Sequence, residues 1–120
     1  MAFKMKGIRF ESGENFHVCK SDIDGKGAIA SKNIKKGELI GTAVTDEEKI
    51  RAKEGMQVDT RTILGRTLNH QDSENAIQKS ENNSLNVYAK NNIKDGDEIT
   101  VNYMNSPDYI NKNEVKGYKK

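Results

Sequence analysis

A short pattern that occurs twice is the feature that most limits how this chain can fold. Residues 30–40 read ASKNIKKGELI and residues 89–99 read AKNNIKDGDEI, so that Ile34 corresponds to Ile93. Each copy is typical of a strand, a tight turn and a second strand, because glycine adopts positive φ and the acid after it can bind turn amides. Two copies are too few for a solenoid. The sequence therefore predicts two similar β-corners packed in one domain.

The other expected elements are short, so a mainly β fold with small sheets and one short helix is predicted. We expect strands, each bounded by Gly, Asn or Asp, at residues 15–20, 28–31, 38–44, 84–90 and 98–103. The helix is expected over residues 46–54, since Thr45 and Glu48 have the spacing of a capping box. Only Ile50 and Ala52 give it an apolar side, which indicates an exposed insert. Residues 71–84 are polar and are expected to form a surface loop.

The composition predicts a single small domain with a thin core. Of the 120 residues, 33% are hydrophobic and none is Trp, and the mean hydropathy is −0.88. A domain of this size buries only about two-thirds of the surface of its unfolded chain. We therefore expect a bound cofactor or a second copy, in a homodimer, to contribute to stability. Residues 1–110 are expected to form the domain and residues 111–120 a flexible C-terminal tail.

Charge and residue counts argue against several classes of protein. Twenty basic and 18 acidic residues leave a net charge of +2, without the basic excess of a nucleic-acid-binding protein. Cys19 is the one cysteine, so neither an intramolecular disulfide nor a cysteine-based zinc cluster is expected. No carboxylate pattern completes a metal site with His17 and His70, and no apolar run reaches the roughly 20 residues of a membrane span. We expect no metal, no direct contact with nucleic acid or membrane, and a cytoplasmic location, or the host nucleus for a virus of eukaryotes.

Three segments carry residues that are candidates for catalysis or ligand binding. Gly25-Lys26-Gly27 precedes a small apolar strand, and by itself it is typical of a hairpin turn. Asn69-His70, with Asn75 further on, is by itself typical of polar side chains that pin a loop. Alternation places Val101 and Tyr103 on one strand face, where a tyrosine is usually structural. No Ser–His–Asp, Cys–His or paired-carboxylate arrangement indicates hydrolysis.

Taken in order, these segments resemble the SET domain of protein-lysine methyltransferases. Residues 25–30 are similar to the opening glycine motif, and residues 33–40 to the turn and strand after it. Residues 66–70, RTLNH, together with Asn75 are similar to the Arg-x-x-Asn-His-x-x-x-x-Asn signature. Residues 89–103 are similar to the closing segment that ends in the catalytic tyrosine. The length resembles the smallest viral and bacterial members, which lack cysteine-rich flanking modules and include proteins that pair.

The resemblance implies a SET-type β-clip with a C-terminal pseudoknot, S-adenosylmethionine as cofactor, and a protein or peptide lysine as methyl acceptor. The backbone of Gly25-Lys26-Gly27 would hold the methionine end of the cofactor. Asn69 would bind its amino end, and the backbone of His70 would meet the adenine. Tyr103 would be the catalytic residue and would place its hydroxyl beside the transferred methyl group.

The resemblance also implies a channel for the substrate lysine, lined by Val101 and Tyr109. Many family members carry an aromatic residue at the position of Val101 that limits the number of methyl groups, so we expect di- or trimethyl-lysine to form. Gln71 and Glu74 depart from the family pattern. We expect them to loosen the loop that carries the signature.

Methyl transfer from a sulfonium suits these parts because it needs no metal. It does need a neutral amine, although free lysine titrates near about 10.4. A dry channel would favour the neutral amine, and positioning of the two reactants would contribute most of the rest. The sequence leaves two other functions open: a SET-like binding module without turnover, and a sugar-binding or structural β-clip. The second has no reason to carry Asn69-His70 and Tyr103 together.

Overall fold

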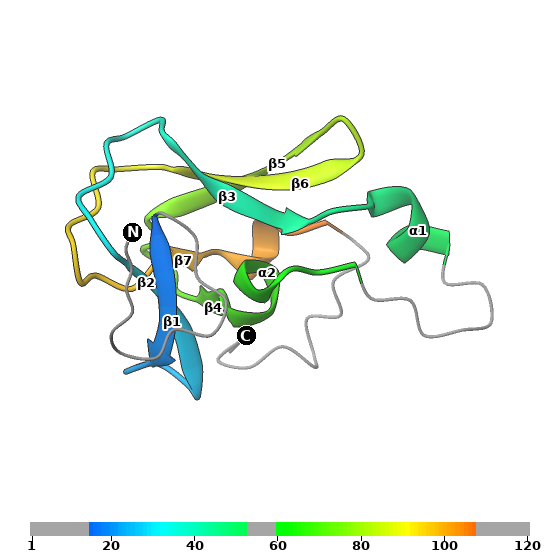
Figure 1. The fold of residues 1–120 in the computed structure, drawn as a ribbon. Helices are drawn as coiled ribbons and strands as arrows, with labels where there is room; N and C mark the ends of the chain where they lie inside the picture. Colours follow the sequence, from blue (N-terminus) through cyan, green and yellow to red (C-terminus); the bar gives the residue numbers. More distant parts are fainter. Residues whose placement is uncertain (1–14, 53–59, 108–120) are drawn as a thin grey trace, which may run out of the picture.

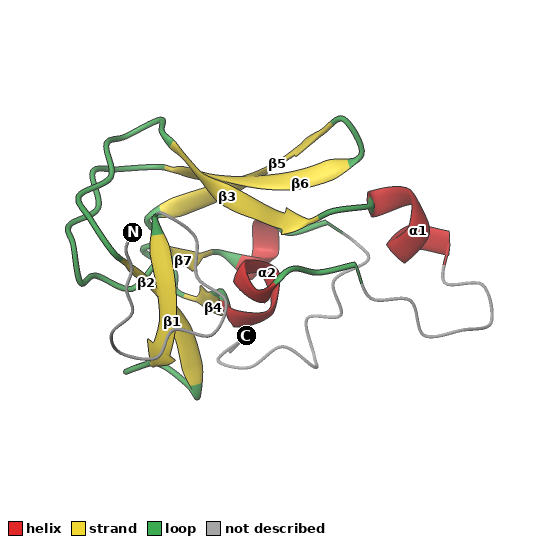
Figure 2. Cartoon of the chain, viewed as in Figure 1, coloured by secondary structure: helices red, strands yellow, loops and turns green. Residues whose placement is uncertain are grey.

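The structure is a computed structural model, and it describes residues 15–52 and 60–107. Strands dominate these residues (Figures 1 and 2). The strands are β1 (Phe16–Lys20), β2 (Lys26–Ala30), β3 (Leu39–Val44), β4 (Asn69–His70), β5 (Ala76–Glu81), β6 (Ser84–Ala89) and β7 (Thr100–Val101). The helices are α1 (Glu47–Ala52), α2 (Ile63–Thr67) and the 3₁₀ helix η1 (Tyr103–Asn105). The mainly β fold is confirmed, but two α-helices are present in this part of the chain where one was predicted.

The strands form three small sheets. β1 pairs with β2, and β3, β6 and β5 form an antiparallel sheet in that order. β4 and β7 are parallel, with Asn69 beside Thr100 and His70 beside Val101. In Figure 1, α2, β4 and β7 lie between the three-stranded sheet and the β1–β2 hairpin, and α2 contacts both β2 and β3. This parallel pair therefore brings the Asn-His segment against the closing segment of the chain.

The two copies of the repeat bind each other reciprocally. Ile34 N–H donates to the Ile93 carbonyl at 2.7 Å, and Ile93 N–H donates back to Ile34 at 2.8 Å. Ala30 donates to the carbonyl of Asp97 and accepts from the N–H of Gly96, both at 2.8 Å. The two strand-turn-strand units thus meet directly, across a long separation in sequence.

The same contacts recur with the copies exchanged. Ala89, the counterpart of Ala30, donates to Glu38 O and accepts from Gly37 N–H, both at 2.9 Å. Gly37 and Gly96 have φ of 89° and 94°, as the turns require. The two corners are therefore related by a local pseudo-twofold axis. The prediction of two similar β-corners packed together is confirmed.

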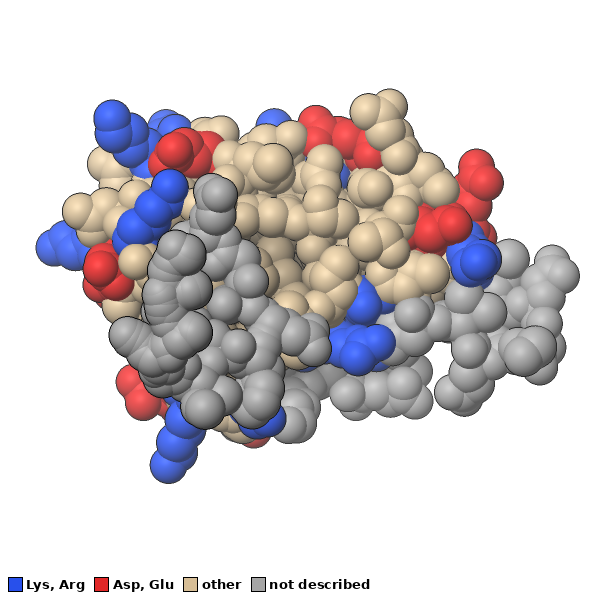
Figure 3. All heavy atoms as spheres, viewed as in Figure 1, with Lys and Arg blue, Asp and Glu red and all other residues tan. Residues whose placement is uncertain are grey.

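The core lies where these corners meet the three-stranded sheet and α2. Its most deeply buried large side chains are Ile34, Val44, Leu64, Leu85, Val87, Ile93, Ile99 and Val101. Around the edge of the face shown in Figure 3, basic and acidic side chains of the described residues lie close to one another. No helix in the described part of the chain is long and apolar enough to span a membrane.

Helix α1 differs from its prediction in its N-cap and in its burial. Lys49 N–H donates to Asp46 Oδ1 at 3.0 Å, whereas the Thr45 hydroxyl donates to the carbonyl of Thr60, so there is no capping box. Ile50 is buried in the core, and α1 is therefore not the exposed insert that was predicted. Ile50 anchors this short helix in the core, and Asn83 in the β5–β6 hairpin turn accepts hydrogen bonds from the first N–H groups of the helix.

The predicted surface loop over residues 71–84 is wrong, since most of its second half is β5. β5 pairs with β6 through a two-residue turn in which Asn82 and Asn83 have φ of 50° and 64°. Positive φ at both central residues is the requirement of a type I′ hairpin turn, and asparagine tolerates it better than most residues. The polar side chains of β5 hid the strand.

The closing segment is also less regular than predicted. Within residues 98–103 only Thr100–Val101 is a strand, and Tyr103 begins η1. The Asn102 side chain ends the strand, because it accepts a hydrogen bond from Met104 N–H at 3.0 Å. Tyr109 and the expected tail lie outside the described residues. The threading of the C-terminal segment and the extent of the domain stay predictions.

Candidate functional site

Helix α2 delivers the Asn-His segment to the centre of the molecule. The Thr62 hydroxyl caps its start by accepting from Gly65 N–H at 3.1 Å. Gly65 packs so closely on β3 that a Cβ there would overlap the Ala43 carbonyl group. Leu68 has extended backbone, which turns the chain from the helix into β4.

The Asn69 side chain connects the turn formed by Gly25-Lys26-Gly27, here called the glycine turn, to the closing segment. This side chain is 3% exposed. Four acceptors share the two hydrogens of its Nδ2 atom: Glu98 Oε2 (2.8 Å), Ser21 Oγ (3.0 Å), Asp24 O (3.1 Å) and Lys26 O (3.3 Å). Its carbonyl oxygen makes no hydrogen bond with any described residue. Asn69 can therefore offer an acceptor, and not a donor, to a ligand.

The glycine turn is built around a carboxylate. A Cβ on Gly27 would overlap the Glu98 carboxylate and would lie 3.0 Å from Ser21 Cβ. Gly25 has φ of 51°, which lets the chain reverse between β1 and β2. Gly27 thus makes room for Glu98, a reason that the sequence did not suggest.

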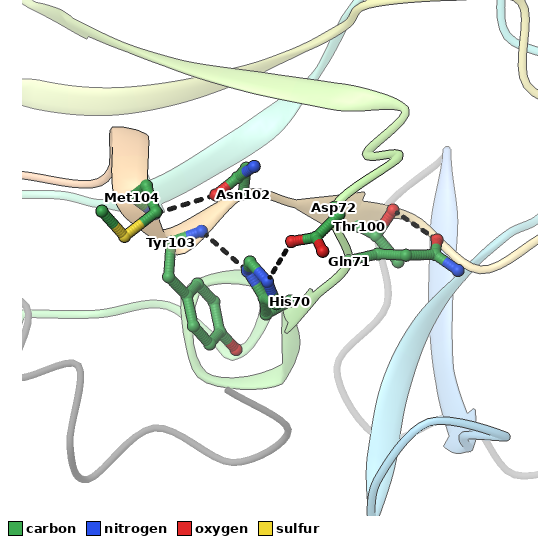
Figure 4. A network of polar contacts seen from close by, with 7 residues as sticks. All are labelled: His70, Gln71, Asp72, Thr100, Asn102, Tyr103 and Met104. Atoms are coloured by element: carbon green, nitrogen blue, oxygen red, sulfur yellow. Dashed lines mark hydrogen bonds and ion pairs between the residues drawn. The ribbon is translucent and has the colours of Figure 1, made fainter. Parts of the chain in front are cut away.

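The His70 side chain supports the backbone of the predicted catalytic tyrosine (Figure 4). Tyr103 N–H donates to His70 Nδ1 at 3.0 Å, and His70 Nε2 lies 3.0 Å from Asp72 Oδ1. Because a backbone N–H can only donate, Nδ1 must carry no hydrogen. The hydrogen of the neutral ring is then on Nε2 and is donated to Asp72.

Tyr103 is 3% exposed, and its hydroxyl donates to the Leu68 carbonyl at 2.7 Å. Its ring lies 5.1 Å from that of His70, centroid to centroid. Burial, and then the negative charges of Asp24 and Glu98, raise the pKa of the Tyr103 phenol well above its usual value. The phenol therefore stays protonated at neutral pH and cannot act as a general base.

Asn75 clamps the signature loop to the closing strand. Its Nδ2 donates to the Glu98 carbonyl at 2.8 Å, and its Oδ1 accepts from Thr100 N–H at 2.9 Å. One side chain thus fixes the backbone on both sides of Ile99.

Gln71 and Glu74 both make contacts in this loop, and the expectation that they loosen it stays a prediction. Gln71 N–H donates to the Val101 carbonyl at 3.0 Å, and its side chain accepts from the Thr100 hydroxyl at 3.2 Å (Figure 4). The Glu74 carboxylate is buried and lies 3.3 Å from Lys90 Nζ.

The structure brings most of the predicted site residues into one region. Gly25-Lys26-Gly27, Asn69, His70 and Tyr103 are linked by the contacts above, and Val101 is buried in β7 beside His70. Tyr109 lies outside the described residues. Ser21 and Glu98 were missed, because their contact joins positions 77 apart and has no local signal. Among the described residues, no group of three His, Cys, Asp or Glu side chains could hold a metal ion.

Comparison with known proteins matches this arrangement to a family. The SET domain profile matches residues 25–104. No curated protein matches the chain. A humanized mutant of the Chaetomium thermophilum Polycomb Repressive Complex 2, bound to an inhibitor, has a similar structure, with 25% identity, a TM-score of 0.60, and coverage of 82% of this chain and 16% of that chain.

Two further structures show the same fold. ctPRC2 in an autoinhibited conformation, bound to S-adenosylmethionine, is 23% identical with a TM-score of 0.60, over 82% of this chain and 16% of that chain. Chaetomium thermophilum Polycomb Repressive Complex 2 bound to an inhibitor is 22% identical with a TM-score of 0.52, over 76% and 16%. The chain thus spans about one-sixth of the length of these larger chains.

Proposed function

Because the chain belongs to the SET domain family, we propose that it is an S-adenosylmethionine-dependent methyltransferase acting on a lysine ε-amine of a protein or peptide. One observation carries the proposal. The Asn69 amide, buried where the glycine turn meets the strand before Tyr103, directs its N–H groups to protein acceptors and keeps its carbonyl oxygen for a ligand.

The residues present fit this cofactor. S-adenosylmethionine carries an ammonium group and a sulfonium, so both its amino end and its reactive centre are cationic. The Asn69 carbonyl oxygen suits the ammonium as an acceptor. The negative charges of Asp24 and Glu98 act on Tyr103, and negative charge close to the site would favour a bound cation. The backbone of Lys26 and Gly27 completes the turn that would hold the methionine end.

This chain's own residues would orient and dry the reacting groups. When bound, the cofactor supplies a methyl group on a positively charged sulfur. The Tyr103 hydroxyl is held by Leu68 and stays protonated. A phenol oxygen also accepts hydrogen bonds, and here it would accept from the substrate amine and aim the nitrogen lone pair. Burial around Tyr103 would favour the neutral amine by desolvation.

Calorimetric titration with S-adenosylmethionine and with its demethylated product tests the proposal. Both should bind and raise the melting temperature, since a ligand at 100 times its Kd stabilises the folded state by about 2.7 kcal/mol. Asn69→Ala should weaken both effects. Asn86→Ala is the matched control, because that amide bonds to Thr42 and Glu81 on the hairpin sheet. No heat and no shift at saturating cofactor would contradict the proposal.

Turnover is tested separately with radiolabelled S-adenosylmethionine and a cell lysate. Label should enter protein and should be recovered as methylated lysine after hydrolysis. Cofactor binding with no transfer to any protein would instead indicate a SET-like binding module.

A further inference from the structure

We propose that Ser21 and Glu98 are positioning residues that fix the orientation of the Asn69 amide, so that its carbonyl oxygen is what the cofactor's ammonium group meets. The inference rests on the proposed function for its ligand. It rests on the hydrogen bonds of the described residues for its geometry.

The hydrogen positions around Ser21 can be assigned from the partners alone. The Ser21 hydroxyl oxygen has two lone pairs, which three donors share: Ile23 N–H (2.8 Å), Asp24 N–H (3.1 Å) and Asn69 Nδ2 (3.0 Å). Its one hydrogen must go to an acceptor. The two Glu98 carboxylate oxygens lie at 2.7 and 2.9 Å. The hydroxyl therefore donates to Glu98. Ser21 is 7% exposed, so water has little access to Glu98 as a substitute for this donor.

The partners of Asn69 likewise determine the orientation of its side-chain amide. The two ends of an asparagine amide are similar in shape, so its orientation depends on its partners. Here the partners of Nδ2 are the Glu98 carboxylate, two backbone carbonyls and the Ser21 oxygen. A reversed amide would place its oxygen against the carboxylate and both carbonyls, which have no hydrogen to donate. The carbonyl oxygen is therefore the group left for a ligand.

Glu98 is held in place from two sides. Gly27 leaves the space that its carboxylate occupies, and the Ser21 hydroxyl donates to it. Ser21 also closes the turn, since its N–H donates to the Gly25 carbonyl at 2.8 Å. Without the Ser21 hydroxyl, Glu98 loses one of its two hydrogen-bond donors and Asn69 loses one acceptor. The Glu98 carboxylate and the amide are then held less firmly, so the Asn69 carbonyl oxygen should meet an ammonium group less well.

The test compares two ligands of one site. S-adenosylhomocysteine carries the amino group, whereas 5′-methylthioadenosine lacks the whole amino-acid part. Ser21→Ala should weaken the binding of S-adenosylhomocysteine about tenfold, which is the effect of losing about one buried hydrogen bond. It should change the affinity for 5′-methylthioadenosine by no more than about twofold. It should also raise the KM for the cofactor with little change in kcat. Ser21→Thr keeps the hydroxyl and should restore most of the affinity.

The control is Ser80→Ala. The Ser80 hydroxyl also donates to a carboxylate, Glu47 Oε2 at 2.8 Å, but on β5 and α1. This variant should leave both ligands unaffected. An equal loss of affinity for both ligands in the Ser21→Ala variant, or no loss of affinity for either, would overturn the positioning role.

A second measurement needs no cofactor and separates this inference from the proposed function. In the free protein, the Asn69 side-chain N–H groups should exchange slowly with solvent by NMR. Ser21→Ala and Glu98→Gln should speed that exchange at least about tenfold, with Asn86 as internal reference. If the wild-type protein binds neither ligand, the proposed function fails while this result still decides the positioning. Unchanged exchange of Asn69 in both variants would overturn it.

Discussion

At the scale of single residues, the Tyr103 hydroxyl has two roles: it donates to the Leu68 carbonyl, and it is proposed to orient the substrate amine. Tyr103→Phe removes the hydroxyl and keeps the packing of the ring against His70. The Leu68 carbonyl then loses its donor, which should cost about 1–3 kcal/mol of stability. Cofactor affinity should persist, while methyl transfer should fall about 10²–10³-fold, as when a positioned polar group is removed. Radiolabel transfer and calorimetry measure the two effects.

Tyr88→Phe is the matched control for this variant. The Tyr88 hydroxyl donates to Glu81 on the β5–β6 hairpin, outside the site. Its loss should leave turnover unchanged. Normal turnover by the Tyr103→Phe variant would rule out the catalytic role of Tyr103.

Val101 carries a separate prediction about the product. It is 2% exposed in β7, beside His70. A valine leaves more space around a bound amine than an aromatic residue would, so di- or trimethyl-lysine should form. Mass spectrometry of the product after long reaction times decides the question. Monomethyl-lysine alone, at complete consumption of the substrate, would contradict the prediction.

The sequence identified residues whose type and spacing form a motif, and it missed those that act through distant contacts. Asn69, His70 and Tyr103 were identified because they belong to such motifs. Ser21 and Glu98 were not, because serine and glutamate are common in polar segments and their contact spans 77 positions. The His70 side chain also gained a role, since only its backbone was expected to take part.

At the scale of elements, Gly65 controls how α2 packs on β3. Helix propensity alone predicts that Gly65→Ala stabilises the protein by about 1 kcal/mol. The structure predicts the opposite, because the new Cβ would overlap the Ala43 carbonyl group. Overpacking of this kind costs about 1–3 kcal/mol, and it would also shift Asn69 at the end of the helix. Urea denaturation measures the sign, and a stabilised variant would refute this packing.

The elements that the sequence predicted are those with a signal of their own. The repeat predicted the two corners because glycine, acid and isoleucine recur in register. Strand β5 was missed because its outward residues are polar and its turn is Asn82-Asn83, a weaker signal than Asn-Gly. The predicted start of helix α1 is confirmed and residues 53 and 54 lie outside the described residues, but the cap was wrong, since a hairpin turn distant in sequence supplies part of its N-terminal contacts.

At the scale of the whole molecule, we propose that the protein forms a homodimer. With 33% hydrophobic residues the core is small. Leu39 and Met104, large apolar side chains among the described residues, are 49% and 66% exposed. Light scattering at tens of micromolar should give twice the chain mass of 13.4 kDa. A monomer mass with full activity would contradict the proposal.

The reciprocal corners should make stability depend on Ile34 and Ile93 as a pair. Each is 2% exposed and they lie directly opposite in an antiparallel bridge. Ile→Val at either position should cost about 0.5–1.5 kcal/mol, with similar values because the two residues are equally buried and their backbone contacts are reciprocal. The double variant should cost less than the sum, since each truncation removes part of the other's contact. Ile50, in the same core but on α1, is the control, and Ile50→Val should add to Ile34→Val. Urea denaturation of the single and double variants measures the coupling, and simple additivity of the Ile34 and Ile93 variants would show that these two side chains do not stabilise each other.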